Sequence, residues 1–214
     1  VSALSNDEVK FDIKLTQLVK LVKNGEPFNM SKRAGTFVTL RDLVDQVGSD
    51  VTRFVMLTRK NDAPLDFDFD KVLEQSRDNP VYYVQYASAR IHSVFRKADV
   101  AGITFDKKLA MNEQFETVTH EAEIKIAKKL AEWPRLVEIA AKTNEPHRIA
   151  FYLYELAGDF HSLWNKGNEI GELRFIQEEN HRASCIKMAM ISAVLVVISS
   201  GLDILGVEPA THMN

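Results

Sequence analysis

The stretch NPVYYVQYASARIHSV (residues 79–94) combines a helix start with a buried helical face. Asn79 is of a residue type that caps helix N-termini, and Pro80 follows at the first helical position, where its missing N–H is harmless. Apolar residues then recur every three or four positions, as on one helical face, at Val84, Ala87, Ile91 and Val94. The stretch predicts a long helix that packs into a hydrophobic core.

Helical spacing continues through most of the chain that follows. We expect a loop at 97–105, a helix over 109–132 that ends near Pro134, and a short helix over 135–142. The next helix starts at Pro146 and turns four apolar residues inward, namely Leu153, Leu156, Phe160 and Leu163. A last long helix is expected over 179–199, ending at Gly201. The pattern predicts a mainly α protein built as a bundle of about five helices.

The residues before this stretch mix strand and helix signals. Apolar residues alternate with charged ones from 9 to 15, which predicts a half-buried strand, and NGEP at 24–27 is a turn signal. Thr39 and Asp42 have capping-box spacing at the start of a helix that we expect to end at Gly48, and a further helix starts at Ser49. Residues 65–70 should run extended into another helix. Because no strand-rich segment follows, we expect the rest of the sheet to lie outside this sequence, leaving a small α/β remnant.

Composition narrows the class of protein. Of the 214 residues 45% are hydrophobic and the net charge is −3, so we expect one large or two small domains, with any nucleic-acid contact confined to a local face. The single cysteine, Cys185, excludes an internal disulfide framework and suits a reducing compartment. No basic and apolar leader opens the sequence, and the apolar run 188–198 is shorter than the roughly 20 residues of a membrane span. We expect a cytoplasmic protein in which that run is a buried helix.

Residues 30–35 (MSKRAG) are the first candidate site. Lys32 is a mobile point charge that suits a phosphate chain, Ser31 adds a hydroxyl, and Gly35 lets the loop change shape. An ordinary solvated loop would explain the same residues. Neither a Walker A loop nor a G-x-G-x-x-G fingerprint occurs in the sequence.

Metal binding is not indicated. The alternating acids at 66, 68 and 70 lack the glycine and glutamate of an EF-hand loop, because Lys71 and Arg77 stand at those positions. The six histidines include no H-E-x-x-H pair, and there is one cysteine. We therefore expect no metal site.

Aromatic and cationic residues at helical spacing are candidates for RNA contacts. Tyr82, Tyr86 and Arg90 lie four residues apart, so they share one stripe of the predicted helix. Such planes can stack unpaired bases and pair with phosphate, but tyrosines can equally pack half-buried against a neighbouring helix. Trp164 and Asn165 present the same choice, because they can contact a loop base or merely close a helix.

Several stretches together resemble one family. Residues 29–70 (from NMSKRAGTF to LDFDFD) and 78–98 (DNPVYYVQYASARIHSVFRKA) resemble the arginyl-tRNA synthetases, which are class I aminoacyl-tRNA synthetases. Residues 145–165 (EPHRIAFYLYELAGDFHSLWN) and 201–207 (GLDILGV) extend the resemblance over nearly the whole chain. It implies a helical-bundle anticodon-binding domain over 71–214. Residues 1–70 would be the C-terminal edge of a catalytic domain, with its signature loop and connecting helices.

The resemblance assigns a role to the polar loop. The class I signature, lysine-methionine-serine-lysine-serine in its usual form, matches Asn29, Met30, Ser31, Lys32 and Arg33. Lys32 falls on the lysine that contacts the ATP phosphates, which implies a catalytic residue that stabilises charge on the leaving pyrophosphate. The family's H-x-G-H motif, which completes the ATP site, occurs nowhere in the sequence. We therefore expect a fragment that is inactive alone and binds no cofactor.

The resemblance also implies substrates and partners. The parent enzyme would be a monomer, without membrane contact, that joins arginine to arginine tRNA with Mg-bound ATP through arginyl-adenylate. Connecting helices, the bundle and the C-terminal tail would hold the tRNA. The residues expected to contact tRNA are Tyr82, Tyr86, Arg90, Trp164, Asn165, Arg182 and Met213.

Two alternatives stay open at this stage. Helical anticodon-binding domains occur in several class I synthetases, so the module can belong to an enzyme for another amino acid. A helical protein-interaction module without RNA is the other alternative, favoured by the negative net charge and the apolar run 188–198. An RNA binder would need a cationic stripe that joins Lys32, Arg33, Arg41, Arg90 and the Trp164 region, and this stripe separates RNA binding from that alternative.

Overall fold

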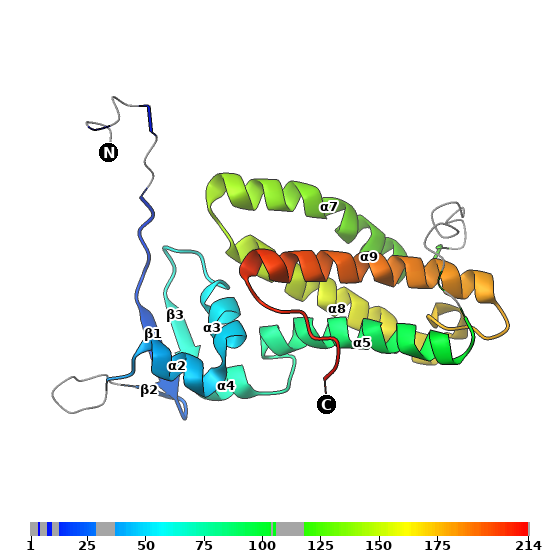
Figure 1. The fold of residues 1–214 in the computed structure, drawn as a ribbon, viewed down its shortest axis with the longest axis horizontal. Coiled ribbons are helices and arrows are strands. Elements are labelled where there is room, and N and C mark those ends of the chain that lie inside the picture. The colour runs from blue at the N-terminus through cyan, green and yellow to red at the C-terminus, as the bar shows by residue number, and fades with distance from the viewer. Residues whose placement is uncertain are drawn as a thin grey trace.

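The computed structural model describes residues 4, 8–9, 13–28, 37–103, 105 and 118–213. A three-stranded sheet with short helices precedes a bundle of long helices, so the predicted mainly α fold is confirmed (Figure 1). The first part contains β1 (Val19–Lys23), β2 (Glu26–Pro27), α2 (Leu40–Val47), α3 (Ser49–Met56), β3 (Leu65–Asp68) and α4 (Phe69–Leu73). The bundle contains α5 (Pro80–Val100), α7 (Glu121–Thr143), α8 (His147–Glu169), the short 3₁₀ helix η2 (Gly171–Leu173) and α9 (His181–Leu205).

The small sheet has the order β2-β1-β3. Asn24 and Gly25 both have positive φ, 55° and 74°, as in the tight turns that match the twist of an antiparallel hairpin. β3 pairs parallel to β1, with Val19 opposite Leu65. This chain therefore supplies the third strand itself, whereas the sequence analysis expected the rest of the sheet to lie outside it.

Two strand predictions are thereby corrected. The strand expected over 9–15 is wrong for its described part, because residues 13–18 have no regular structure and Leu15 is 80% exposed. Residues 10–12 lie outside the described part of the chain. The strand forms instead at β1, where Leu21 is buried, and the segment 65–68 pairs with it because Leu65 and Phe67 point into the core. Alternation alone could not distinguish a strand from an exposed chain that nothing covers.

The helix starts before the bundle follow their sequence signals. Thr39 Oγ1 accepts a hydrogen bond from the Asp42 N–H at 3.1 Å, and Asp42 Oδ2 accepts one from the Thr39 N–H at 2.8 Å. This is the predicted capping box, and it starts α2. Gly48 ends α2 at φ 88°, and α3 begins at the next residue.

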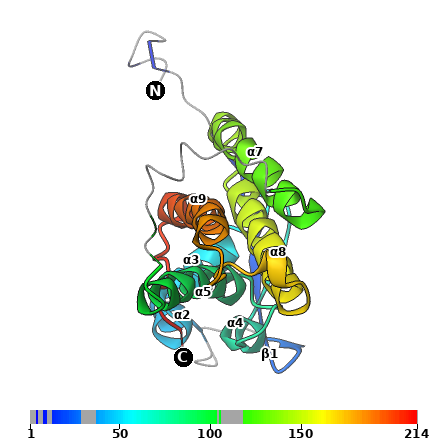
Figure 2. The same ribbon diagram turned by 90° about the vertical axis from the view of Figure 1, so that its right-hand side faces the viewer.

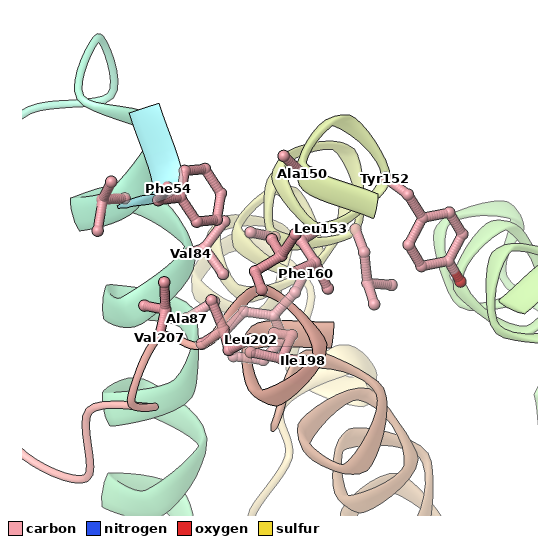
Figure 3. Packing of buried hydrophobic residues seen from close by; sticks show 14 of the residues in the cluster. Phe54, Val84, Ala87, Ala150, Tyr152, Leu153, Phe160, Ile198, Leu202 and Val207 are labelled. Atoms are coloured by element: carbon pink, nitrogen blue, oxygen red, sulfur yellow. The ribbon is translucent and has the colours of Figure 1, made fainter. Parts of the chain in front are cut away.

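In the bundle α8 packs against α5, α7 and α9, and Figure 2 shows this arrangement nearly end-on. The four side chains predicted to point inward from α8 are all fully buried: Leu153, Leu156, Phe160 and Leu163. They meet Val84 and Ala87 of α5 and Ile198 and Leu202 of α9 in one continuous core (Figure 3). Phe54 of α3 belongs to the same cluster, so the first part of the chain is attached through apolar packing.

The helix boundaries differ from the sequence predictions at two connections. α5 continues to Val100, so the loop expected from 97 begins later. α7 runs unbroken through Pro134, where the sequence predicted a break between two helices. Proline removes one backbone hydrogen bond, but the helix continues because residues on both sides of it pack on α8. Residues 106–117, where that helix was expected to begin, lie outside the described residues, and α7 starts after His120.

The last helix is longer than predicted. α9 ends at Leu205 and is capped by Gly206 at φ 68°, while Gly201, the expected end, lies inside the helix. Among the described helices α9 is the one whose length and hydropathy would suffice to cross a membrane, so the expectation that its apolar run is too short is corrected. Half of that apolar window is buried in the bundle. A buried ion pair between Lys187 of α9 and Glu123 of α7 also favours a core helix.

Gly201 allows α9 to approach α8 closely, and this gives a stability prediction. An added Cβ would lie 2.6 Å from Leu153 Cδ2, and Leu153 is fully buried and has no solvent to move into. Gly201→Ala should therefore lower the free energy of unfolding by about 1–3 kcal/mol despite alanine's better helix propensity. Gly158→Ala in α8 is the control, because its Cβ would meet only Tyr83 at 3.8 Å. Urea denaturation measures both variants, and equal stabilities of Gly201→Ala and wild type would contradict the prediction.

Candidate nucleic-acid interface

The predicted aromatic stripe exists on α5. The rings of Tyr82 and Tyr86 are stacked, with centroids 5.7 Å apart and planes inclined by 18°. One turn further on, the Arg90 guanidinium carbon lies 4.3 Å from the Tyr86 centroid. The structure therefore brings these three side chains into one continuous stack, as their spacing indicated.

Trp164 joins this stack from α8. The Arg90 guanidinium lies 5.0 Å from the Trp164 ring centroid, so the cation contacts aromatic rings from two helices. Trp164 is held in turn by ring contacts with Phe160 and Phe175. Trp164, which the sequence suggested separately from the α5 stripe, thus belongs to the same cluster on the structure.

The C-terminal tail crosses α5 (Figure 1). Its backbone is attached at Glu208, whose N–H donates to Asp50 Oδ2 at 3.2 Å and whose carbonyl accepts from Gln85 Nε2 at 3.1 Å. Further along, Arg96 Nη1 donates to the Thr211 carbonyl at 3.2 Å. These bonds place the end of the tail beside the Arg90 cluster.

Between α5, Trp164 and the tail lies a hollow of about 330 Å³, which we call the α5–tail hollow. Its described lining is Tyr86, Ala89, Arg90, Ser93, Arg96, Lys97, Trp164, His212 and Met213. Three of these side chains are cationic and none is acidic. Aromatic faces next to uncompensated cations can stack an unpaired base and pair with the phosphate beside it.

His161 of α8 contacts this cluster from its buried side. Its ring is buried, with Nδ1 3.2 Å from Arg90 Nη1 and Nε2 3.2 Å from the Tyr83 carbonyl. Tyr83 and Tyr86 both contact the imidazole, with centroids 4.5 and 5.6 Å away. Burial, together with the nearby Arg90 charge, lowers the pKa of His161 to about 4 against the opposing effect of the Tyr83 bond. The imidazole is therefore neutral at physiological pH.

Other predicted contact residues lie elsewhere. Asn165 is exposed on α8 and lines a separate hollow of about 840 Å³ between α7 and α8, together with Lys125 and Asp159. Arg182 is exposed in the first turn of α9 and lines neither hollow. The signature-loop candidates lie outside the described residues: Asn29, Met30, Ser31, Lys32 and Arg33.

Two of the acids considered for calcium, Asp68 and Asp70, have structural roles. Asp68 caps α4 through a bond from the Asp70 N–H at 3.1 Å, and Asp70 Oδ2 accepts from the Asn24 N–H at 2.6 Å. Within the described ranges no three His, Cys, Asp or Glu side chains lie close enough to hold a metal ion.

Sequence reasoning missed His161, Arg96 and His212 as parts of the candidate interface. His161 stands one helical turn before Trp164, which is the one local signal that could have drawn attention to it. Arg96 and His212 meet only because the tail folds back onto α5, and no local spacing reports such a contact.

A comparison with known protein families supports the same class of protein as the fold and the site. The fold and the site define a helical anticodon-binding module. A family described as "DALR anticodon binding domain" matches residues 84–213, and the chain belongs to this family.

The relatives that match over the full chain are arginine–tRNA ligases. The chain is 69% identical to the "Arginine--tRNA ligase" of Ruegeria pomeroyi and 65% identical to that of Roseobacter denitrificans, in each case over 214 residues. It spans 37% of the length of each of these relatives. The predicted resemblance is confirmed.

Solved structures of arginyl-tRNA synthetases superpose on this chain. A structure titled as a putative arginyl-tRNA synthetase from Campylobacter jejuni superposes with a TM-score of 0.78 at 30% identity, over 93% of this chain and 40% of that one. The Thermus thermophilus arginyl-tRNA synthetase has a TM-score of 0.63 at 21% identity, over 90% and 34% of the two chains, and supports the fold.

The buried neutral imidazole gives a pH prediction. Histidine in the unfolded chain has a pKa near 6.5, so between pH 6.5 and 4 the unfolded state binds more protons than the folded one. The contribution of His161 to stability should therefore be complete above about pH 6.5 and fall by at most about 3 kcal/mol as pH drops to 4. Urea denaturation of wild type and of His161→Asn across this range measures it, because the difference between them removes the titration of other groups. A difference independent of pH would show that His161 is not buried as a neutral group.

Proposed function

We propose that this chain is the tRNA-binding part of an arginine–tRNA ligase. The full-length protein attaches arginine to arginine tRNA with ATP, through arginyl-adenylate. The observation that carries the proposal is the α5–tail hollow, where Tyr86 and Trp164 meet Arg90 on an anticodon-binding fold. In the described part of the chain Arg90 pairs with no carboxylate. The 69% identity to a named arginine–tRNA ligase along the whole chain supports the choice of amino acid.

In the proposed complex an unpaired anticodon-loop base enters the α5–tail hollow. The exposed part of the aromatic cluster offers a stacking surface, and the Met213 side chain at the end of the tail adds an apolar contact. Arg90, Arg96 and Lys97 face the adjoining phosphates, which accounts for binding by a chain whose net charge is −3. Tyr82 continues the stack toward the inner limb of the tRNA. Asn165 and Arg182 are proposed as peripheral contacts outside the hollow.

The ATP chemistry of the proposed enzyme is divided between this chain and another part of the protein. Lys32, with Ser31 beside it, is proposed to contact the phosphates of Mg-bound ATP and to stabilise the leaving pyrophosphate. Asn29 supplies no charge where relatives of this class carry lysine, so Lys32 bears this role without a second loop lysine. We propose a monomeric, cytoplasmic enzyme. The 69% identity to an arginine–tRNA ligase favours this reading over a module from a synthetase for another amino acid. The described lining of the α5–tail hollow, which is cationic and has no acid, favours it over a protein-interaction module.

Removing the central cation tests the binding site. Arg90→Ala should weaken binding of an arginine tRNA transcript about tenfold or more, because a charge-assisted phosphate contact and the stack it organises are both lost. Arg135→Ala is the matched control, because Arg135 is an exposed arginine of α7 that lines neither hollow. Filter binding at several salt concentrations measures both variants, and wild-type affinity should fall as salt rises. Equal affinities of Arg90→Ala and Arg135→Ala would contradict the proposed site.

The missing half of the ATP site gives a second prediction. Purified chain mixed with arginine, ATP and arginine tRNA should show no ATP–pyrophosphate exchange above background, because the sequence contains no H-x-G-H motif. The same chain should still bind the tRNA in the filter assay. Clear exchange by the chain alone would contradict the proposed division of the active site.

A further inference from the structure

We infer that His161 is a positioning residue for RNA binding: its neutral Nδ1 fixes the Arg90 guanidinium between Tyr86 and Trp164 without cancelling the positive charge. The inference rests on the proposed function, because it assumes that Arg90 contacts tRNA. It concerns a different residue and a different physical property, namely how a cation is held and kept available.

The two bonds of His161 determine its tautomer. A guanidinium only donates hydrogen bonds, so the Nδ1 that lies 3.2 Å from Arg90 Nη1 must be the unprotonated acceptor. A carbonyl only accepts, so the Nε2 that lies 3.2 Å from the Tyr83 oxygen must carry the proton. Both bonds are satisfied in the Nε2–H form alone. In the doubly protonated form an N–H would face the guanidinium.

Arg90 needs such a partner because the rings leave its in-plane orientation free. Tyr86 and Trp164 lie near the guanidinium at 4.3 and 5.0 Å, and contacts with ring faces do not direct its N–H groups. Nδ1 of His161 supplies a directed acceptor. The imidazole is itself fixed, because it is buried, bonded to the backbone of α5 and packed against Tyr83.

A carboxylate would hold Arg90 more firmly but would neutralise it. Two other cations near α8 are paired in that way: Lys125 with Asp159 at 2.6 Å, and Lys129 with Glu155. Among the described residues no carboxylate pairs with Arg90. A neutral imidazole therefore orders this cation for a phosphate or base that arrives from outside.

Two substitutions separate the two nitrogens. His161→Asn places an amide oxygen near the position of Nδ1 and keeps an acceptor for Arg90. His161→Gln places an amide near the position of Nε2, so it keeps a donor for the Tyr83 carbonyl but removes the acceptor. A role confined to packing or to the Tyr83 bond would make Gln the better replacement, whereas positioning of Arg90 makes Asn the better one.

The test measures Arg90 first without RNA and then with it. In a Trp133→Phe background Trp164 is the remaining tryptophan, and its fluorescence reports the cation above its ring. His161→Gln should shift the emission in the same direction as Arg90→Ala, and His161→Asn should shift it less. Filter binding of an arginine tRNA transcript should weaken about tenfold with His161→Gln and clearly less with His161→Asn.

The outcomes distinguish the inference from the function on which it rests. If Arg90→Ala leaves tRNA affinity unchanged, the proposed binding site fails. If Arg90→Ala weakens binding but His161→Gln behaves like His161→Asn or better, the positioning inference alone is overturned. Nitrogen-15 spectra of the unsubstituted chain at neutral pH add a readout that needs no variant. An unprotonated Nδ1 is expected, and a protonated Nδ1 would overturn the inference whatever the variants do.

Discussion

The packing of α8 against three other helices is the constraint on which the rest of the structure depends. Its buried face, with Leu153, Phe160 and Leu163, contributes to a core shared with α5 and α9. Each such side chain stabilises the fold by about 1.5–3 kcal/mol. Gly201 lets α9 approach Leu153 closely, so the relative position of these helices is narrowly fixed. Because this core fixes α5 and α8 relative to each other, it also fixes the relative positions of Arg90 and Trp164, which meet between the two helices.

The candidate interface takes its geometry from this packing of α5 against α8. Arg90 comes from α5, while Trp164 and His161 come from successive turns of α8, and none of the three is on a loop. Sites built on helices keep their side chains in place better than sites built on loops. The tail is the exception, and hydrogen bonds from side chains of α3 and α5 to the backbone of Glu208 and Thr211 attach it. A net negative chain thereby presents a locally cationic and aromatic face.

The sequence predicted what local spacing controls. The cap at Asn79, the capping box at Thr39, the inward face of α8 and the Tyr82–Tyr86–Arg90 stripe all follow from residues within one or two helical turns of each other. The class of protein was predicted from the resemblance to a family. The aromatic stripe and the helix cap alone are compatible with many helical bundles. Trp164 was named as a candidate, but its place beside Arg90 depends on how two helices pack.

The remaining features depend on contacts between distant residues. β3 pairs with β1 across 46 positions, and Arg96 reaches Thr211 across 115. Pro134 and Gly201 read as helix ends because each weakens a helix in isolation, yet packing against α8 retains both helices. A lone histidine on an apolar helix face gave no sign of its partner, so His161 emerged only when α8 was placed against α5.

Photo-crosslinking from the tail tests the central claim most directly, namely that an anticodon-loop base enters the α5–tail hollow. A diazirine amino acid in place of Met213, which lines this hollow, should crosslink to arginine tRNA on irradiation. The account predicts that sequencing of the adduct maps it to the anticodon loop, and that excess unlabelled arginine tRNA suppresses it. An adduct confined to the acceptor stem, or equal adducts with unrelated tRNAs, would contradict the account.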